Sequence, residues 1–270
     1  MKSRKDYTGG ITGVSKGAVL THSNISSAIQ QFTSMFYDLN EGEESVLGVY
    51  SIFHAAGYSV SQNMTILKGW TCILIPRPEP GIIVEMLKKF KPSFLPGVPT
   101  IYTGLLNNKA FTDMDLSFVK GYFAGAAPLP DDTSQQLKKN HGAVINDVYG
   151  ATENSAFAVS TPWRGKIKKG TVGVPLPNTD LKIVDLKKGE TILPSGKEGE
   201  ICIKGPQVMK AYYKKEEDTK STIKDGWFHT GDIGFLDNDG YLTVVDLKKD
   251  IIISSGYNVY PKEIDRKQCQ

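Results

Sequence analysis

The hydrophobic pattern of the chain changes near residue 165, and this change constrains the fold more than any other feature. Before it, short apolar runs such as residues 46–50 alternate with segments of helical spacing such as residues 25–36. This alternation favours a parallel sheet covered by helices. After it, turn clusters at residues 187–190 and 237–240 separate short apolar runs, which favours antiparallel strands.

The sequence therefore predicts an α/β fold, in which a parallel sheet layered with helices is followed by a smaller antiparallel β subdomain. The first helix is expected to begin at an N-cap residue, Ser23 or Asn24. A later helix is expected to carry Pro130 in its first turn. Helices are predicted at residues 25–36, 58–67, 82–90 and 130–139, and strands at 46–50, 72–75, 122–124, 143–145, 181–184, 200–203 and 241–245.

Composition excludes several classes of protein. The net charge of +3, without a run of five or six like charges, argues against a nucleic-acid partner. Cys72, Cys202 and Cys269 have no metal-ligand spacing, and no stretch is apolar enough to span a membrane. We expect a cytoplasmic protein that acts on small molecules. The sequence leaves peripheral membrane contact and the oligomeric state open.

Residues 7–17 form the strongest chemical motif, with four glycines, two threonines and Lys16 within eleven positions. Glycines let backbone N–H groups close around an anion, hydroxyls add donors, and a lysine supplies the opposite charge. The motif is neither a Walker A loop, because Gly17 follows Lys16, nor a dinucleotide fingerprint. It favours a triphosphate-binding loop, and the alternative interpretation is a flexible surface loop.

From residue 7 to His22 the chain resembles the phosphate-loop signature of the adenylate-forming superfamily, which includes acyl-CoA synthetases, luciferases and peptide-synthetase adenylation domains. Further segments resemble other motifs of that superfamily in its own order, and the segment at residues 94–100 resembles the long-chain fatty acyl-CoA ligases most. The remaining motifs lie at residues 51–54, 125–129, 149–153, 225–232 and 246–264.

This resemblance implies a two-step reaction that uses ATP, Mg²⁺ and coenzyme A. A carboxylate attacks the α-phosphate of ATP, and the thiol of coenzyme A then attacks the acyl-adenylate. The resemblance implies catalytic roles for Lys16, Thr152 and Glu153, with Mg²⁺ held by Glu153. It implies acyl contacts at His54, Gly97 and Gly125, and a hinge at Lys249. The implied nucleotide-binding residues are Thr8, Gly9, Gly10, Thr12, Gly13, Lys16, Gly17, Gly125, Ala126, Ala127, Tyr149, Gly150, Ala151, Thr152, Glu153 and Asp232.

The chain departs from the superfamily pattern at Ile11, Ser51 and Leu247, which replace a usual Thr, Pro and Arg. The resemblance divides the chain into a nucleotide- and acyl-binding part (1–160), a β-rich subdomain (161–246), and a hinge with the start of a C-terminal domain (247–270). We expect a fragment without the superfamily's N-terminal region and most of its C-terminal domain, with little ligase turnover alone. Two alternatives stay open: a non-catalytic nucleotide- or acyl-binding remnant, and a ligase for an aryl or other acid.

Overall fold

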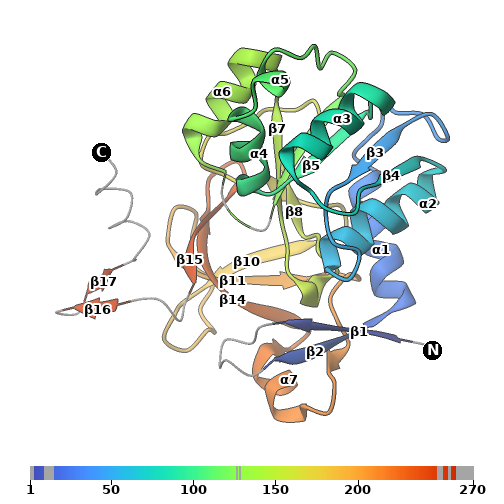
Figure 1. Cartoon of the computed structure of the whole chain (residues 1–270). Coiled ribbons are helices and arrows are strands. Elements are labelled where there is room, and N and C mark those ends of the chain that lie inside the picture. Colours follow the sequence, from blue (N-terminus) through green and yellow to red (C-terminus); the bar gives the residue numbers. More distant parts are fainter. Residues whose placement is uncertain are drawn as a thin grey trace.

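The computed structural model describes residues 3–8, 15–125, 127, 129–247, 252–254 and 257–259. It contains a seven-stranded sheet flanked by helices and, beneath it, a largely antiparallel β region (Figure 1). This architecture confirms the predicted fold class. None of the helices within the described ranges is long and apolar enough to cross a membrane.

The seven-stranded sheet has the strand order β4-β3-β5-β6-β7-β8-β9. Neighbouring strands from β4 to β7 run parallel, and β8 and β9 extend the sheet in antiparallel pairing. The strands are β3 (Ser45–Gly48), β4 (Thr71–Leu74), β5 (Phe94–Gly97), β6 (Gly121–Gly125), β7 (Ile145–Tyr149), β8 (Val159–Ser160) and β9 (Val174–Pro175).

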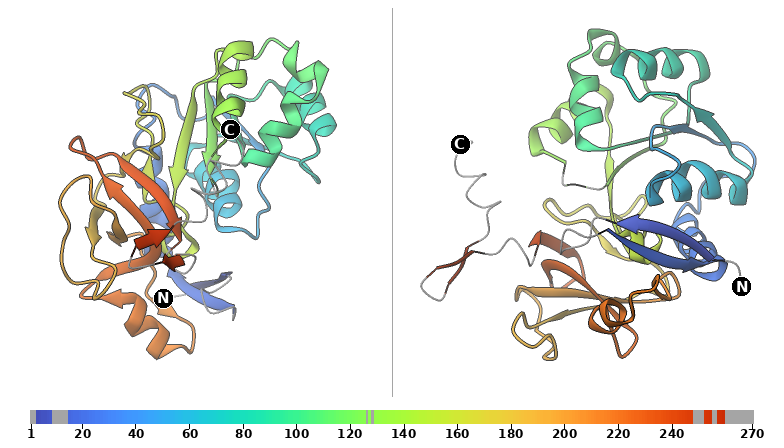
Figure 2. Two further views of the ribbon diagram at one scale, coloured as in Figure 1. Left: turned by 90° about the vertical axis from the view of Figure 1, so that its left-hand side faces the viewer. Right: turned by 60° about the horizontal axis from the view of Figure 1, so that its bottom comes forward.

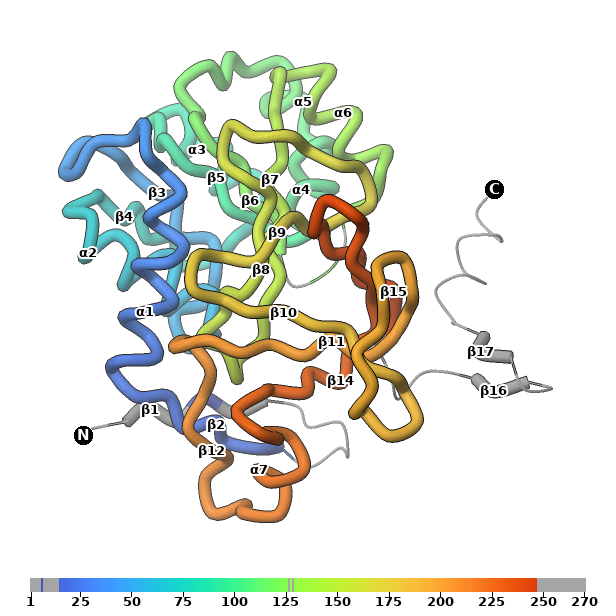
Figure 3. The backbone as a smooth tube through the Cα atoms, turned by 180° about the vertical axis from the view of Figure 1, so that it is seen from behind, coloured from blue at the N-terminus to red at the C-terminus, as the bar shows by residue number. Residues whose placement is uncertain are grey.

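Helices cover both faces of this sheet, with α1 behind it and α3 to α6 in front of it in Figure 1, whereas Figure 3 shows α1 from the other side. The π-helix η1 packs beside α1 and continues into α2. The bounds are α1 (His22–Thr33), η1 (Gly57–Met64), α2 (Thr65–Lys68), α3 (Pro80–Phe90), α4 (Pro99–Leu106), α5 (Lys109–Thr112) and α6 (Asp131–His141).

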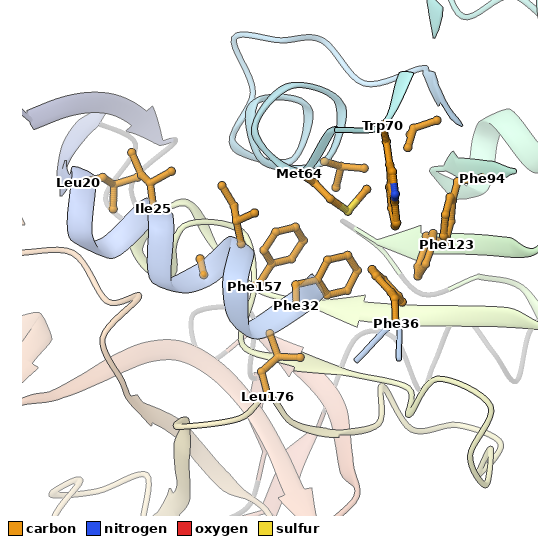
Figure 4. Packing of buried hydrophobic residues seen from close by; sticks show 14 of the residues in the cluster. Leu20, Ile25, Phe32, Phe36, Met64, Trp70, Phe94, Phe123, Phe157 and Leu176 are labelled. Carbon is orange, nitrogen blue, oxygen red and sulfur yellow. The ribbon is translucent and has the colours of Figure 1, made fainter. Parts of the chain in front are cut away.

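The apolar runs of the parallel strands supply both faces of the sheet with buried side chains. Phe94 and Phe123 point into the cluster under α1, whereas their neighbours Leu95 and Tyr122 point into the cluster under α3 to α6. Figure 4 shows the first cluster, in which Phe32 of α1 lies next to the rings of Phe157 and Phe36. Parallel strands buried on both faces read as continuous apolar runs, which explains the sequence pattern.

The first helix begins earlier than its apolar spacing predicted. Thr21 is the N-cap of α1, and its hydroxyl accepts the backbone N–H of Asn24 at 3.1 Å. The side chain of Asn24 accepts the N–H of Thr21 in return at 2.9 Å. The prediction of Ser23 or Asn24 as N-cap is therefore wrong, because Asn24 takes the third position of a capping box. Likewise, Pro130 is the N-cap of α6 rather than a residue of its first turn.

The antiparallel region has two parts, and a separate hairpin pairs β16 with β17. In the larger sheet β11 and β14 are central, with the order β10-β11-β14-β13 and β15 paired to β14. In the smaller sheet the hairpin β1–β2 pairs with β12 through β2. The elements are β1 (Ser3–Thr8), β2 (Lys16–Thr21), β10 (Asp180–Val184), β11 (Gly199–Lys204), β12 (Ala211–Tyr212), α7 (Glu216–Thr222), β13 (Ile223–Lys224), β14 (Trp227–Leu236), β15 (Leu242–Leu247), β16 (Ile252–Ser254) and β17 (Tyr257–Val259).

Helix–strand alternation places residues 1–160 in the parallel layer and does not predict the hairpin β1–β2. The hairpin belongs instead to an antiparallel sheet with β12. Thr8 and Lys16 are Cα partners at the end of this hairpin. The hairpin lies beside α7, on the side of the molecule away from α3 to α6 (Figures 1 and 2). The fold thereby brings the beginning of the chain next to residues 211–222.

Candidate functional site

A cavity of about 710 Å³ opens at the carboxyl ends of the parallel strands. Its wall includes Val49 and Tyr50 after β3, Val98 after β5, Gly125 at the end of β6 and Gly150 after β7. Open α/β sheets bind ligands at this edge, because each strand there ends in a connection that can carry functional groups. The volume lies within the range of small-molecule sites, roughly 300–1,000 Å³.

The cavity wall is apolar and aromatic. Among the described residues that line it, none carries a carboxylate, an ammonium or a guanidinium group, and His54 is its one ionisable nitrogen base. A charged group buried here would therefore lack a partner, which is costly. The lining residues are Phe32, Val49, Tyr50, Ser51, Phe53, His54, Ala55, Ala56, Val60, Pro78, Pro80, Val98, Thr100, Ile101, Phe123, Ala124, Gly125, Val148, Gly150, Ala151, Thr152, Ala156 and Phe157.

Several residues predicted from motifs meet in this wall: His54, Gly125, Gly150, Ala151 and Thr152. His54 lies near the exposed Phe53, and its Nδ1 accepts the backbone N–H of Ala56 at 3.2 Å.

Gly97 lies outside the wall, although it was predicted to contact the acyl group. A Cβ atom there would come within 2.9 Å of the ring of Tyr102, so packing inside the protein already requires glycine. Its carbonyl accepts the hydroxyl of Tyr50 at 2.8 Å, and Tyr50 does line the cavity.

The connection after β7 links the cavity to polar groups outside it. Gly150 is required there, because a Cβ atom would lie 2.2 Å from the carbonyl oxygen of Ala156. The turn continues into the 3₁₀ helix η2 (Thr152–Asn154), and the side chain of Asn154 accepts the N–H of Ala151 at 2.7 Å. Residues 149–153 thus run from one polar group, Tyr149, along the cavity wall to another, Glu153.

At one end of this connection, Glu153 belongs to a buried polar cluster. The hydroxyl of Tyr212 donates to Glu153 Oε1 at 2.8 Å. Burial first, and then the neighbouring Glu153 carboxylate, raise the pKa of Tyr212, so its hydroxyl remains a donor at neutral pH. The ammonium of Lys16 lies 5.3 Å from the centroid of the Tyr212 ring and forms an ion pair with Asp218 of α7. The predicted phosphate lysine therefore connects through Tyr212 to the predicted metal ligand.

At the other end, the hydroxyl of Tyr149 donates to Asp232 Oδ2 at 2.6 Å. Burial and then the Asp232 carboxylate raise the pKa of Tyr149 well above its ordinary value, so this contact keeps its proton. Tyr149 and Asp232, two of the predicted nucleotide-binding residues, are 83 residues apart in the sequence and are thus neighbours in the fold. In the strand pairing, Asp232 stands opposite Leu247, the residue that replaces the usual arginine.

The structure leaves part of the predicted set untested. Ala127 is described and exposed, and Gly17 is described and buried within β2. Thr8 is described only in its backbone, at the end of β1. The residues that lie outside the described ranges are Gly9, Gly10, Ile11, Thr12, Gly13, Ala126 and Lys249.

Sequence reasoning missed Tyr212 and Asp218, which complete the cluster around Lys16 and Glu153. Neither stands in a recognisable motif, and the contact of Asp218 spans 202 residues of sequence. The pairing of β12 with β2 brings both into place, and no local pattern indicates such a pairing.

The fold and this cavity place the chain in the α/β class of proteins with a ligand site at the carboxyl edge of a parallel sheet, and the sequence comparison identifies the family. The pattern of the AMP-binding enzyme family matches residues 6–213, so the chain belongs to that family.

Among curated relatives, the long-chain-fatty-acid–CoA ligase of Bacillus subtilis is 41% identical over 259 residues, which is 96% of this chain and 46% of the relative. The chain spans about half the length of the curated relatives it matches.

Solved structures support the same assignment. The ATP-bound structure of MatB from Rhodopseudomonas palustris superimposes with a TM-score of 0.90 at 34% identity, covering 97% of this chain and 51% of that one. O-succinylbenzoate coenzyme A synthetase from Bacillus subtilis, in complex with ATP and magnesium, superimposes with a TM-score of 0.87 at 28% identity. That match covers 97% of this chain and 53% of the synthetase.

Proposed function

We propose that the chain forms the nucleotide- and acid-binding part of an ATP-dependent ligase that activates a carboxylic acid and transfers it to coenzyme A. One observation carries this proposal: an uncharged cavity adjoins the polar residues at both ends of segment 149–153. An acyl-adenylate has the same two halves, an apolar tail and a charged nucleotide, joined at the reacting carbonyl.

The positions of the described residues suggest how the two substrates are aligned. The acid tail would occupy the cavity, with its carboxylate directed towards Thr152 in the wall. The ribose hydroxyls would bind the Asp232 carboxylate, and the triphosphate would extend towards Lys16. Placing the carboxylate oxygen near the α-phosphate supplies most of the rate in such displacements, because the protein contributes alignment and charge neutralisation.

Glu153 fits the demands of Mg²⁺. This ion is usually bound by one or two carboxylates together with phosphate oxygens and water. Glu153 is 9% exposed, and one of its oxygens is oriented by Tyr212. When bound, Mg²⁺ would neutralise charge on the triphosphate. Thr152, the preceding residue, would offer a hydroxyl on the cavity side.

Within the class of acids, we propose a long-chain fatty acid. The uncharged wall supports an apolar tail, because a second carboxylate in the acid would find no cationic partner among the described lining residues. The similarity to fatty-acid ligases points in the same direction. The aromatic side chains Phe32, Phe123 and Phe157 favour a second candidate, an aryl acid whose ring carries no charged group.

Calorimetric titration with Mg²⁺ and ATP tests the nucleotide half of the proposal. We expect binding by the wild type and at least about tenfold weaker binding by Asp232→Ala, because a charged hydrogen-bond acceptor is lost. The matched control is Asp132→Ala, at an exposed position in the first turn of α6. A wild-type chain that binds no nucleotide would refute the proposal.

Palmitate-dependent ATP–pyrophosphate exchange separates a ligase from a non-catalytic binding module. It is best measured with this chain replacing the matching 259 residues of the Bacillus subtilis relative, so that the rest of that enzyme is present. Exchange supports the ligase. A chimera that binds ATP and palmitate without exchange supports the binding module.

A further inference from the structure

A second cluster of titratable side chains lies in the β11–β14 sheet, outside the cavity wall. Nδ1 of His229 is 3.3 Å from Glu200 Oε2 and 3.4 Å from the sulfur of Cys202. The exposed fractions are 9% for His229, 6% for Glu200 and 0% for Cys202. Gly189 covers the cluster, since a Cβ atom there would lie 3.5 Å from Cε1 of His229.

The order Cys–His–Glu is that of a nucleophilic triad, but the burial argues against that chemistry. A cysteine nucleophile needs access to its substrate, and the sulfur of Cys202 has none. None of the three residues lines the cavity. The thiol of Cys202 donates a hydrogen bond to the backbone carbonyl oxygen of Glu200, with the sulfur 3.9 Å from that oxygen. A carboxylate can only accept, so we assign the ring proton to Nδ1 of His229, which donates to Glu200 Oε2.

The other oxygen of Glu200 reaches the nucleotide side of the sheet. Glu200 Oε1 accepts the backbone N–H of Gly231 at 3.2 Å. This contact occurs where the pairing of β11 and β14 shifts register, after Glu200. Gly231 has φ +74°, a left-handed conformation that glycine adopts without strain. A buried carboxylate thus receives a backbone donor at an irregularity of the sheet, one residue before Asp232.

The residue before this glycine is held as well. The hydroxyl of Thr230 donates to the carbonyl of Ile201 at 2.9 Å and accepts the N–H of Asp232 at 3.0 Å. Glu200 and Thr230 therefore fix the two peptide groups that precede the Asp232 side chain. Tyr149 then holds the Asp232 carboxylate itself.

We propose that Glu200 is a positioning residue for nucleotide binding: it holds the Gly231 peptide so that the Asp232 carboxylate is oriented towards the ribose hydroxyls. The inference rests on the proposed function, in which Asp232 contacts the ribose. His229 and Cys202 complete the support, because they fix the other oxygen and the backbone of Glu200. Glu200 itself touches no substrate.

The test compares the affinities of ATP and 2′,3′-dideoxy-ATP, because only the ribose hydroxyls distinguish them. The wild type should prefer ATP, and Asp232→Ala should lose the preference. Glu200→Ala should reduce the preference by about tenfold with little change in dideoxy-ATP affinity. Glu200→Gln should retain it, because the amide oxygen can still accept from Gly231 while the amide NH2 donates to Nδ1 of the other His229 tautomer. The matched control is Glu198→Ala, an exposed carboxylate two residues earlier. Equal weakening of both nucleotides by Glu200→Ala would overturn the inference.

A second test measures hydrogen exchange of the Gly231 amide in the nucleotide-free wild type. It requires neither a variant nor an activity assay. The contact with Glu200 predicts slow exchange. Exchange as fast as that of an exposed loop amide would overturn the inference even if Glu200→Ala fails to fold. A wild type that binds both nucleotides equally would instead refute the ribose role of Asp232, on which the inference rests, whereas the Gly231 exchange rate tests only the contact with Glu200.

Discussion

Asp147→Asn is expected to stabilise the protein at neutral pH. Asp147 is partly buried in β7, opposite Ala124 of β6 in the strand pairing. Burial raises the pKa of its carboxyl from 3.8 to about 6. A shift of about two units corresponds to about 3 kcal/mol, since each unit is worth about 1.4 kcal/mol. Burying the asparagine amide also costs free energy, so the expected gain in the free energy of unfolding is about 1–2 kcal/mol at pH 7.

The pH dependence gives a sharper test than the stability at one pH. Between the unfolded pKa near 3.9 and the folded pKa of about 6, the folded protein binds more protons at this group than the unfolded chain. Its contribution to the free energy of unfolding therefore falls as the pH rises through this window and is constant above it. Integration gives a loss of about 2 kcal/mol between pH 4.5 and 7.5.

Urea unfolding of both proteins across this range measures the effect. The difference in unfolding free energy between Asp147→Asn and the wild type should grow by about 2 kcal/mol from pH 4.5 to 7.5. The matched control is Asp225→Asn, because Asp225 is exposed and its φ of +50° suits asparagine equally well. A difference independent of pH would refute the conclusion that burial raises the pKa of the Asp147 carboxyl.

Three further predictions concern the site. Lys16→Ala should weaken the binding of Mg²⁺ and ATP in calorimetry. Asp218→Ala releases Lys16 from its ion pair and should leave the affinity unchanged or raise it. Equal losses of affinity in the two variants would mean that Lys16 only connects β2 to α7. Tyr212→Phe should lower the free energy of unfolding by about 1.5–3 kcal/mol, because the buried Glu153 loses a donor; a loss below about 0.5 kcal/mol would contradict this. Phe32→Ala should cost about 3–5 kcal/mol in urea unfolding, because its ring is 1% exposed and stacks on another ring at 4.3 Å; a loss near 1 kcal/mol would show that the cluster can collapse around the change.

Local periodicity predicted the parallel layer well. The apolar spacing of residues 25–36 led to α1, and the runs at 46–50 and 72–75 led to β3 and β4. The signals of α1 and β3 are strong because burial is one-sided in the helix and two-sided in the strand, whereas the edge strand β4 buries only Ile73. Their ends were less certain, since a cap depends on side-chain contacts such as that between Thr21 and Asn24.

Where a segment was interpreted only as a chemical motif, the strands that it forms were not predicted. The motif at residues 225–232 forms most of β14, the strand at the centre of the antiparallel sheet. Its burial does not alternate strictly, because the register shifts beside Gly231. The glycine-rich motif likewise concealed the hairpin β1–β2.

Motifs identified segment 149–153 and Gly125 as candidates, and the structure brings them together because they stand at the carboxyl ends of the neighbouring parallel strands β7 and β6. They could not reveal Tyr212, Asp218 or Glu200. These residues act through contacts that only the folded chain creates, at 2.8 Å to Glu153 for Tyr212 and 3.2 Å to the Gly231 amide for Glu200. Single-sequence patterns carry no information about such long-range pairing.

The most direct test of an apolar acyl cavity beside a nucleotide site is a binding series of non-hydrolysable acyl-adenylate analogues. Acyl sulfamoyl adenosines with tails of increasing length, from acetyl to palmitoyl, would be titrated into the wild-type chain. Each methylene that enters the cavity should tighten binding by up to about fourfold, since its burial is worth about 0.8 kcal/mol. Affinity should therefore rise until the tail fills the cavity. An affinity that is independent of tail length, or a benzoyl analogue that binds more tightly than the palmitoyl one, would contradict the account.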